Sequence, residues 1–272
     1  MVLFQHKEVD GINALVSSFR AARKIVFSNY FGVSEGYEYD VFTSENVLLI
    51  RKKEYHFYRL FFLCSDEKEL QYILSDLKGY EYITNIPTRV PIDDKIELLK
   101  ECGFEMIAEY NRYYNKSIQS AYEKLCKMSD SLSINEDYEL VCPAKADDIS
   151  QIWDLLNRNF SLYTDHIPNK NELSDMVTQQ HVFVNKTHEG EVFGVHIFTT
   201  TNQLCYGNAW LDTKGYGILL SKNMIKYALE HNIKTINYWV RKGNNQVVRY
   251  HKMMGAVADG MSDYSFLKKN IS

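Results

Sequence analysis

Residues 211–220 read LDTKGYGILL, and this stretch decides how the second half of the chain is interpreted. Gly215 and Gly217 let the backbone approach a ligand closely, and a helix that starts here points its first unpaired N–H groups toward that ligand. Leu220 and Met224 follow at the i, i+4 spacing of a helix that packs on a sheet. The stretch therefore predicts a phosphate-type anion site at the start of a helix.

The residues after this helix continue an alternation of strand and helix. Lys234–Val240 is rich in β-branched and aromatic residues, which is typical of a strand. Arg241–Asn245 is predicted to form a turn, and Gln246–Ala256 a short helix that ends at Gly255 in the C′ position. This order of elements resembles the GNAT superfamily of acyl-CoA N-acyltransferases.

The phosphate-loop motif of that superfamily is Arg/Gln-x-x-Gly-x-Gly/Ala. Gly215 and Gly217 match its glycines, whereas Asp212 stands where Arg or Gln is usual. Upstream segments fit the first strand, the first helix and the central hairpin of the family. These segments are Tyr138–Val141, Asp147–Phe160, His181–Asn185 and Glu191–Thr200.

A second family pattern consists of Asn, then Tyr seven residues later, then Gly-Phe. Asn244 and Gly255 match this pattern. His251 falls at the Tyr position, next to Tyr250, and Ala256 replaces Phe. The resemblance covers residues 136–270.

The front half of the chain has the same element order as residues 206–268. Its predicted strands and helices are Tyr58–Leu63, Asp66–Leu77, Glu81–Asn85, Asp93–Glu101 and Glu105–Tyr114. We interpret this order as an internal structural repeat. Asp66, Glu67 and Glu69 replace the glycine turn of the later copy and would repel a pyrophosphate. The fold class is therefore predicted to be α/β, with two GNAT-like domains, each a mixed central sheet flanked by helices, and with a degenerate N-terminal copy that does not bind coenzyme A.

Ser117–Ser133 places Ala121, Leu125 and Met128 at helical spacing and ends in a run of small polar residues. We interpret it as a linker helix followed by a short joint, which puts the domain boundary near residue 130. The expected domains are residues 1–130, degenerate and including the linker helix, and residues 131–272, catalytic.

Composition narrows the classes of function. The chain has 272 residues, of which 45% are hydrophobic, and a net charge of −4 without a basic stripe, so no nucleic-acid partner is expected. No apolar run has the length of a signal peptide or a membrane span. The five cysteines are scattered and lack metal-ligand spacing, so we expect no metal and a reduced, cytoplasmic protein. The sequence leaves the oligomeric state open.

The family resemblance implies that a primary amine attacks the thioester of bound acetyl-CoA directly, in a ternary complex. The backbone from Lys214 to Ile218 would hold the diphosphate, and backbone N–H groups near Trp210 and Leu211 would polarise the thioester carbonyl. Asn244 would bind the pantetheine or brace its loop. The residues expected to bind the cosubstrate are Trp210, Leu211, Lys214, Gly215, Tyr216, Gly217, Ile218 and Asn244.

The acid that protonates the leaving thiolate is left open between two neighbours. His251 stands at the family position, and Tyr250 would serve if the helix were rotated by one residue, which is about 100°. A third alternative is that no dedicated acid is needed. His196 is a candidate general base, although a histidine among apolar neighbours is more often structural. Other residues that could face the acceptor are Tyr206, Asn208, Asp212, Tyr163, Asp165 and His166.

The expected function is transfer of an acetyl group from acetyl-CoA to the primary amine of a small molecule. One alternative is an aminoacyl-tRNA-dependent transferase of the kind that builds peptidoglycan cross-bridges, which also pairs two GNAT-like domains. Another is a non-catalytic ligand-binding protein, which Asp212, His251 and the degenerate front half would suit.

Overall fold

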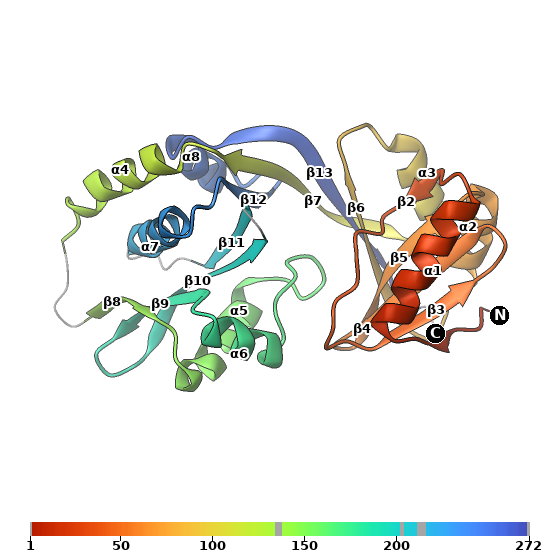
Figure 1. Ribbon diagram of the computed structural model, residues 1–272, viewed down its shortest axis with the longest axis horizontal. Coiled ribbons are helices and arrows are strands. Elements are labelled where there is room, and N and C mark those ends of the chain that lie inside the picture. The colour runs from red at the N-terminus through yellow and green to blue at the C-terminus, as the bar shows by residue number, and fades with distance from the viewer. Residues whose placement is uncertain (1, 134–137, 202–203, 211–215, 271–272) are drawn as a thin grey trace. The chain divides into compact units, whose positions relative to one another are not determined.

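The computed structural model describes residues 2–133, 138–201, 204–210 and 216–270 (Figure 1). The chain forms two compact units. Unit 1 consists of Met1–Tyr110 together with Met261–Ser272, and unit 2 consists of Asn111–Gly260. Each unit is a mixed sheet with helices, so the α/β class predicted from the sequence is confirmed.

Unit 1 is built mainly from the front half of the chain. In chain order its elements are β1 (Gln5–His6), α1 (Val9–Ala22), β2 (Phe27–Ser28), β3 (Tyr39–Thr43), β4 (Val47–Glu54), β5 (Phe57–Cys64), α2 (Glu67–Ser75), β6 (Glu81–Thr88) and α3 (Asp93–Glu101). The strand order β1-β3-β4-β5-β6 is continued by β13 (Val257–Lys268), and β2 pairs with β5. The β5–β6 pair is parallel, whereas the β4–β5 pair is antiparallel.

Unit 2 follows the same plan. Its elements are α4 (Ile118–Ser129), β8 (Tyr138–Pro143), the 3₁₀ turn η1 (Ala146–Asp148), α5 (Ile149–Asn159), α6 (Lys170–Thr178), β9 (Val182–Thr187), β10 (Val192–Thr201), β11 (Leu204–Trp210), α7 (Gly217–Glu230), β12 (Thr235–Arg241) and α8 (Asn245–Met253). The strand order is β8-β9-β10-β11-β12, continued by β7 (Glu105–Asn115) and β13. Only the β11–β12 pair among β8 to β12 is parallel.

Both faces of the unit 1 sheet are buried, because successive residues of a strand point to opposite faces. Leu60 and Phe62 of β5 belong to a core shared with α2 and α3, whereas Phe61 and Leu63 belong to one shared with α1. A strand that is covered on both faces reads as a continuous apolar run, which is what FYRLFFLC shows apart from Arg59. That arginine is the exception that marks a polar site.

The last strand of each repeat, β7 in the front half and β13 in the second half, pairs with the sheet of the other unit. β13 pairs with β6 over the register from Ser262↔Thr88 to Lys268↔Tyr82. β7, which follows α3 in the chain, lies between β12 and β13. Thus β13, the last strand of the chain, completes the sheet of unit 1, and β7, which follows α3, completes the sheet of unit 2.

Because of this strand exchange, the two compact units have different bounds from the expected domains, which were residues 1–130 and 131–272. The exchange assigns residues 261–272 to unit 1 and places the division of the front half at residue 110. Ala121 and Leu125 of α4 pack in one core with Met224 and Ala228 of α7, so the expected linker helix is part of unit 2. The apolar spacing predicted the helix but not the surface on which it packs.

Glycines end corresponding helices in the two units, as the sequence predicts. Gly103 after α3 has φ +84° and Gly255 after α8 has φ +90°, the left-handed conformation that favours glycine at a helix end. Within the described residues, no helix combines the length and the apolar character needed to span a membrane.

Asn115 fixes the exchanged strand β7 within unit 2. Its side chain is fully buried, donates to the Met254 carbonyl at 2.8 Å and accepts from the Ser117 N–H at 2.8 Å. Asn115→Ala should lower the free energy of unfolding by about 1–3 kcal/mol, because it strips two backbone groups of their partner. Urea denaturation measures this change.

Asn171→Ala provides the control, because Asn171 is exposed on α6. Its effect should stay within about 0.5 kcal/mol. Equal losses in the two variants would mean that Asn115 does not anchor the strand.

Candidate functional site

The two parallel strands at the centre of unit 2 separate part-way along their length. β11 and β12 pair over three residues and their described register ends at Tyr206↔Asn237. β11 nevertheless continues to Trp210, paired with β10, and β12 continues to Arg241. The separation leaves facing edges of β11 and β12 that are not paired with each other. A bound group carrying amides could pair with such an edge.

The start of α7 follows β11 along the chain. Tyr216 occupies the N-cap position and Gly217 is the first helical residue, and both are buried. No side chain of the described residues caps this helix, and the Leu219 N–H donates to the Tyr216 carbonyl at 2.9 Å. The N–H groups of Gly217 and Ile218 are therefore the ones that face the helix start, where an anion would bind. Tyr216 is held in place by a hydrogen bond from its hydroxyl to the Ser133 carbonyl at 3.3 Å.

The described first turn contains three of the residues expected to hold the diphosphate, namely Tyr216, Gly217 and Ile218. Trp210 lies at the end of β11, where its backbone is described. Leu211, Asp212, Lys214 and Gly215 lie outside the described residues. The described part of the predicted loop is therefore the start of α7, which no side chain of the described residues caps.

Asn244 is the N-cap residue of α8. Its Oδ1 accepts a hydrogen bond from the Val247 N–H at 3.3 Å, and the side chain is exposed. Helix capping therefore accounts for an asparagine here. The predicted contact of Asn244 with pantetheine stays a prediction.

Tyr250, on α8, has a buried hydroxyl that makes no hydrogen bond of ordinary geometry within the described residues. Burial raises the pKa of Tyr250, and the nearby Ser221 hydroxyl of α7 offsets part of that increase. The Tyr250 hydroxyl thus lies toward the first turns of α7. The side chain remains a neutral proton donor at pH 7.

His251, the next residue, has different surroundings. Its ring stacks on Tyr238 of β12, with 4.0 Å between centroids and 28° between planes. Burial lowers the pKa of His251 to about 4. Burial, and then the charge of His251, lowers the pKa of His196 on β10 to about 4 as well. Both imidazoles are therefore neutral at pH 7, and neither carries the extra proton of an imidazolium.

The structure thus brings together Tyr250 with Ser221, and His251 with Tyr238 and His196. Ser221 and Tyr238 are not among the residues singled out from the sequence. Ser221 could have been found, because it follows Gly217 by four residues and therefore lies on the same helical face. Tyr238 reads as ordinary strand composition, so no sequence signal marks it.

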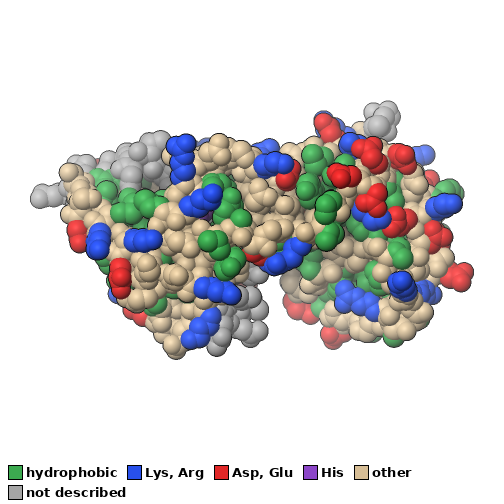
Figure 2. Space-filling model, turned by 90° about the horizontal axis from the view of Figure 1, so that it is seen from above, with side chains coloured by type: hydrophobic (Ala, Val, Ile, Leu, Met, Phe, Trp, Pro, Cys, Tyr) green, Lys and Arg blue, Asp and Glu red, His purple; other side chains and the backbone are tan. Residues whose placement is uncertain are grey.

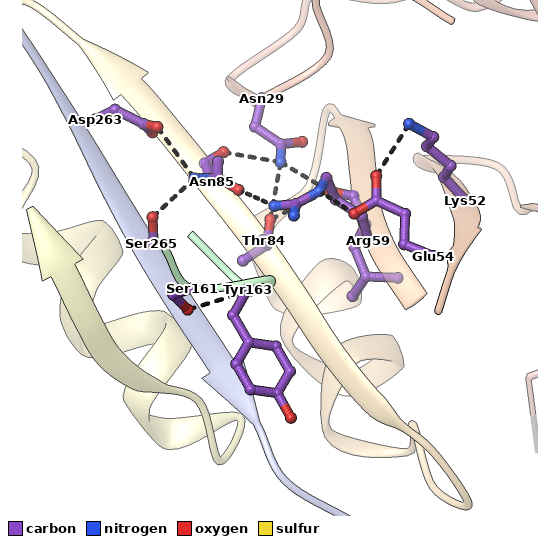
Figure 3. A network of polar contacts seen from close by, with 11 residues as sticks. Asn29, Lys52, Glu54, Arg59, Thr84, Asn85, Ser161, Tyr163, Asp263 and Ser265 are labelled. Atoms are coloured by element: carbon purple, nitrogen blue, oxygen red, sulfur yellow. Dashed lines mark hydrogen bonds and ion pairs between the residues drawn. The ribbon is translucent and has the colours of Figure 1, made fainter. Parts of the chain in front are cut away.

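The remaining acceptor-side candidates are placed only in part. Tyr206 and Asn208 lie on β11, of which the backbone alone is described. The Ser161 N–H donates to Asp165 Oδ2 at 2.7 Å. The Tyr163 N–H donates to the Ser161 hydroxyl at 3.3 Å, as Figure 3 shows. His166 follows with φ +49°, in the left-handed region. These contacts define a turn, and a contact with an acceptor stays a prediction.

No family model and no curated protein matches the sequence. Solved structures do match its fold. A tandem GNAT protein from the clavulanic acid biosynthesis pathway has a TM-score of 0.59 and 9% identity, over 100% of this chain and 99% of its own. This chain has a tandem GNAT fold.

Two further structures agree with this assignment. A GNAT-family acetyltransferase from Colwellia psychrerythraea has a TM-score of 0.53 and 10% identity, with 99% of each chain covered. A GCN5-related N-acetyltransferase from Sphaerobacter thermophilus has a TM-score of 0.54 and 10% identity, over 89% of this chain and 83% of its own. At these identities the likeness concerns the GNAT fold, which the sequence motifs predict.

The first GNAT copy carries a buried polar network (Figure 3). Arg59 of β5 is 2% exposed and donates to Glu54 Oε2 at 3.0 Å and to Asn85 Oδ1. Lys52 lies 3.0 Å from the other oxygen of Glu54. A buried guanidinium is stable only when its charge is paired and its donors are used, and Glu54 and Asn85 serve that purpose here.

The network extends to a carboxyl group on the exchanged strand β13. The Asn85 amide donates to Asp263 Oδ2 at 3.0 Å and to the Ser265 hydroxyl at 2.8 Å. Asp263 Oδ1 is buried without a hydrogen-bond partner in the described residues. Burial raises the pKa of Asp263 to about 6, although the Asn85 hydrogen bond and the Arg59 charge oppose the increase.

Because of Asp263, the free energy of unfolding should fall as the pH rises from 4 to 6. The folded-state pKa of about 6 lies above the ordinary value of 3.8, so its stabilising contribution is complete below pH 3.8 and is lost as the pH rises to 6. Asp263→Asn cannot ionise. Its free energy of unfolding relative to wild type should therefore increase between pH 4 and 6.5, by about 1–3 kcal/mol.

Urea denaturation of both proteins across this range measures the difference, in which the contributions of His196 and His251 cancel. A difference that does not change with pH would show that Asp263 is ionised with an ordinary pKa in the folded protein.

Proposed function

We propose that the protein is an acyl-CoA-dependent N-acyltransferase that transfers an acetyl group from acetyl-CoA to a primary amine of a small molecule. The observation that carries the proposal is the separation of β11 and β12 after Tyr206↔Asn237. The chain then leads to the start of α7, which no side chain of the described residues caps. This combination offers an edge for an extended chain with amides and, in the same unit, an anion site.

The cosubstrate would use these two features in different ways. The diphosphate would accept hydrogen bonds from the N–H groups of Gly217 and Ile218 and would gain from the positive end of the α7 dipole. The pantetheine amides would pair with the unpaired strand edge, in the manner of an added β-strand. Both contacts use the main chain, so Asp212 in place of Arg or Gln does not remove them.

The reaction would be a single displacement at the thioester carbon. The amine nitrogen forms a bond to that carbon, the carbon–sulfur bond breaks, the amine loses a proton and the thiolate gains one. Of the two acids left open by the sequence, Tyr250 fits better, because its hydroxyl is neutral and buried and makes no ordinary hydrogen bond to the described residues. His251 has a pKa of about 4 and lacks an imidazolium proton at neutral pH.

Gly217→Val tests the anion site. A β-branched side chain at the first residue of α7 should obstruct the approach of a diphosphate to the N–H groups, so calorimetric titration with acetyl-CoA should show at least a tenfold loss of affinity. Gly11→Val is the matched control in α1, where a new Cβ would meet only Lys7 Cδ, at 3.8 Å. Unchanged affinity in Gly217→Val would remove the phosphate-loop assignment.

Tyr250→Phe tests the acid. We expect kcat to fall about 100-fold, at the lower end of the contribution of a positioned general acid, with little change in acetyl-CoA affinity. His251→Asn should leave the pH dependence of kcat between 6 and 8 unchanged, because His251 does not titrate there. The reverse pattern, an active Tyr250→Phe and an inactive His251→Asn, would assign the role to His251.

Binding of acetyl-CoA without turnover on any amine would instead support the ligand-binding alternative.

A further inference from the structure

The central parallel strands of unit 1 separate in the same way as those of unit 2. β5 and β6 pair in parallel register only as far as Leu60↔Thr84. β5 then continues to Cys64 and β6 to Thr88. The front copy thus has the strand opening that would hold an acyl-CoA, if the proposed function of unit 2 is correct.

A segment of the chain itself pairs with the edge of β5 that this separation exposes. β2 is antiparallel to β5 with the register Phe27↔Cys64 and Ser28↔Leu63. The Val26 N–H adds a further hydrogen bond to the Cys64 carbonyl at 2.9 Å. Residues 26–29 therefore occupy the edge with which a pantetheine chain would otherwise pair.

Asn29 closes the gap between the two strands with its side chain. Its amide nitrogen lies 3.0 Å from the Leu60 carbonyl of β5, and 3.0 Å from the Asn85 carbonyl and 2.8 Å from the Thr84 hydroxyl of β6. Its Oδ1 accepts the Phe62 N–H at 2.7 Å. Asn29 is 3% exposed, so one carboxamide satisfies buried groups of both strands where the sheet hydrogen bonds stop.

The anion site of unit 1 is occupied in a comparable way. α2 begins after β5, as α7 begins after β11, but α2 is capped. Asp66 Oδ1 accepts hydrogen bonds from the N–H groups of Lys68 at 2.9 Å and Glu69 at 3.4 Å. A carboxylate therefore stands at the helix start where a phosphate would lie. Most acidic side chains visible in Figure 2 also lie over unit 1, which disfavours an anionic ligand there.

We infer that unit 1 is a cofactor cleft filled by its own chain, with residues 26–29 in place of the pantetheine and the Asp66 carboxylate in place of the diphosphate. The protein therefore binds one acyl-CoA per chain, in unit 2. The identity of the excluded ligand rests on the proposed function, whereas the self-occupied cleft stands on the contacts of Asn29 and Asp66 alone. The sequence predicts the acidic turn at Asp66, which fills the anion site, but not β2, which fills the strand opening.

Amide hydrogen exchange of the ligand-free protein tests the self-occupied cleft. The Phe62 N–H should be strongly protected in wild type, and Asn29→Ala should speed its exchange at least tenfold. Asn46→Ala is the control, because Asn46 also bonds through its side chain in unit 1, to Glu69 at 2.9 Å, but lies outside the gap between β5 and β6. An unprotected Phe62 N–H in wild type would overturn the inference.

Calorimetric stoichiometry tests the consequence. Wild type should bind one acetyl-CoA per chain. Gly217→Val, which weakens the site in unit 2, should reveal no further binding site in unit 1. Two sites in wild type, or undiminished binding to unit 1 in Gly217→Val, would overturn the inference. An absence of binding in wild type would overturn the proposed function of unit 2, while the exchange of Phe62 would still decide whether unit 1 fills its own cleft.

Discussion

The structure depends on how backbone groups are satisfied where two central parallel strands separate. Buried N–H and C=O groups need partners, and a sheet that opens part-way along its length withdraws them. In unit 1 the chain supplies those partners through β2 and the Asn29 side chain. In unit 2 no described segment pairs with β11 and β12 beyond Tyr206↔Asn237 in that way. The same opening is thus filled by the chain in unit 1, whereas no described segment fills it in unit 2, which is where we propose that the cosubstrate binds.

The exchange of the last strands explains why neither half of the sequence corresponds to a whole unit. β13 completes the unit 1 sheet through seven register pairs with β6, and it carries Asp263 and Ser265 into the polar network around Asn85. In unit 2, Asn115 and the ion pair of Arg112 with Asp259, at 2.6 Å, hold β7 and β13 in place. Unit 1 therefore combines residues 1–110 with residues 261–272, which are among the last in the chain, so its sheet is completed only by contacts of large sequence separation.

Burial determines which side chains of the candidate site can exchange protons at neutral pH. It holds the pKa values of His196 and His251 near 4 and raises that of Tyr250, so at neutral pH the tyrosine keeps its hydroxyl proton and neither imidazole carries an extra one. In the reaction we propose, the Tyr250 hydroxyl, which makes no ordinary hydrogen bond to the described residues, gives its proton to the developing thiolate. The family pattern in the sequence favours His251 as the acid, whereas the buried surroundings of the two side chains are the reason we propose Tyr250.

The sequence by itself determined the repeated order of strands and helices, the glycine stops at Gly103 and Gly255, and the loss of the glycine turn at Asp66, because each depends on neighbours within a few residues. It could also place Gly217 at the start of α7, since apolar spacing marks that helix. Only the tertiary structure decided the strand exchange, the packing of α4 on α7, the filling of the unit 1 cleft by Asn29, and the buried surroundings of Tyr250 and Asp263. Each of these unites segments that are distant in the chain, and the energies of burial and of hydrogen-bond satisfaction exist only once those segments meet.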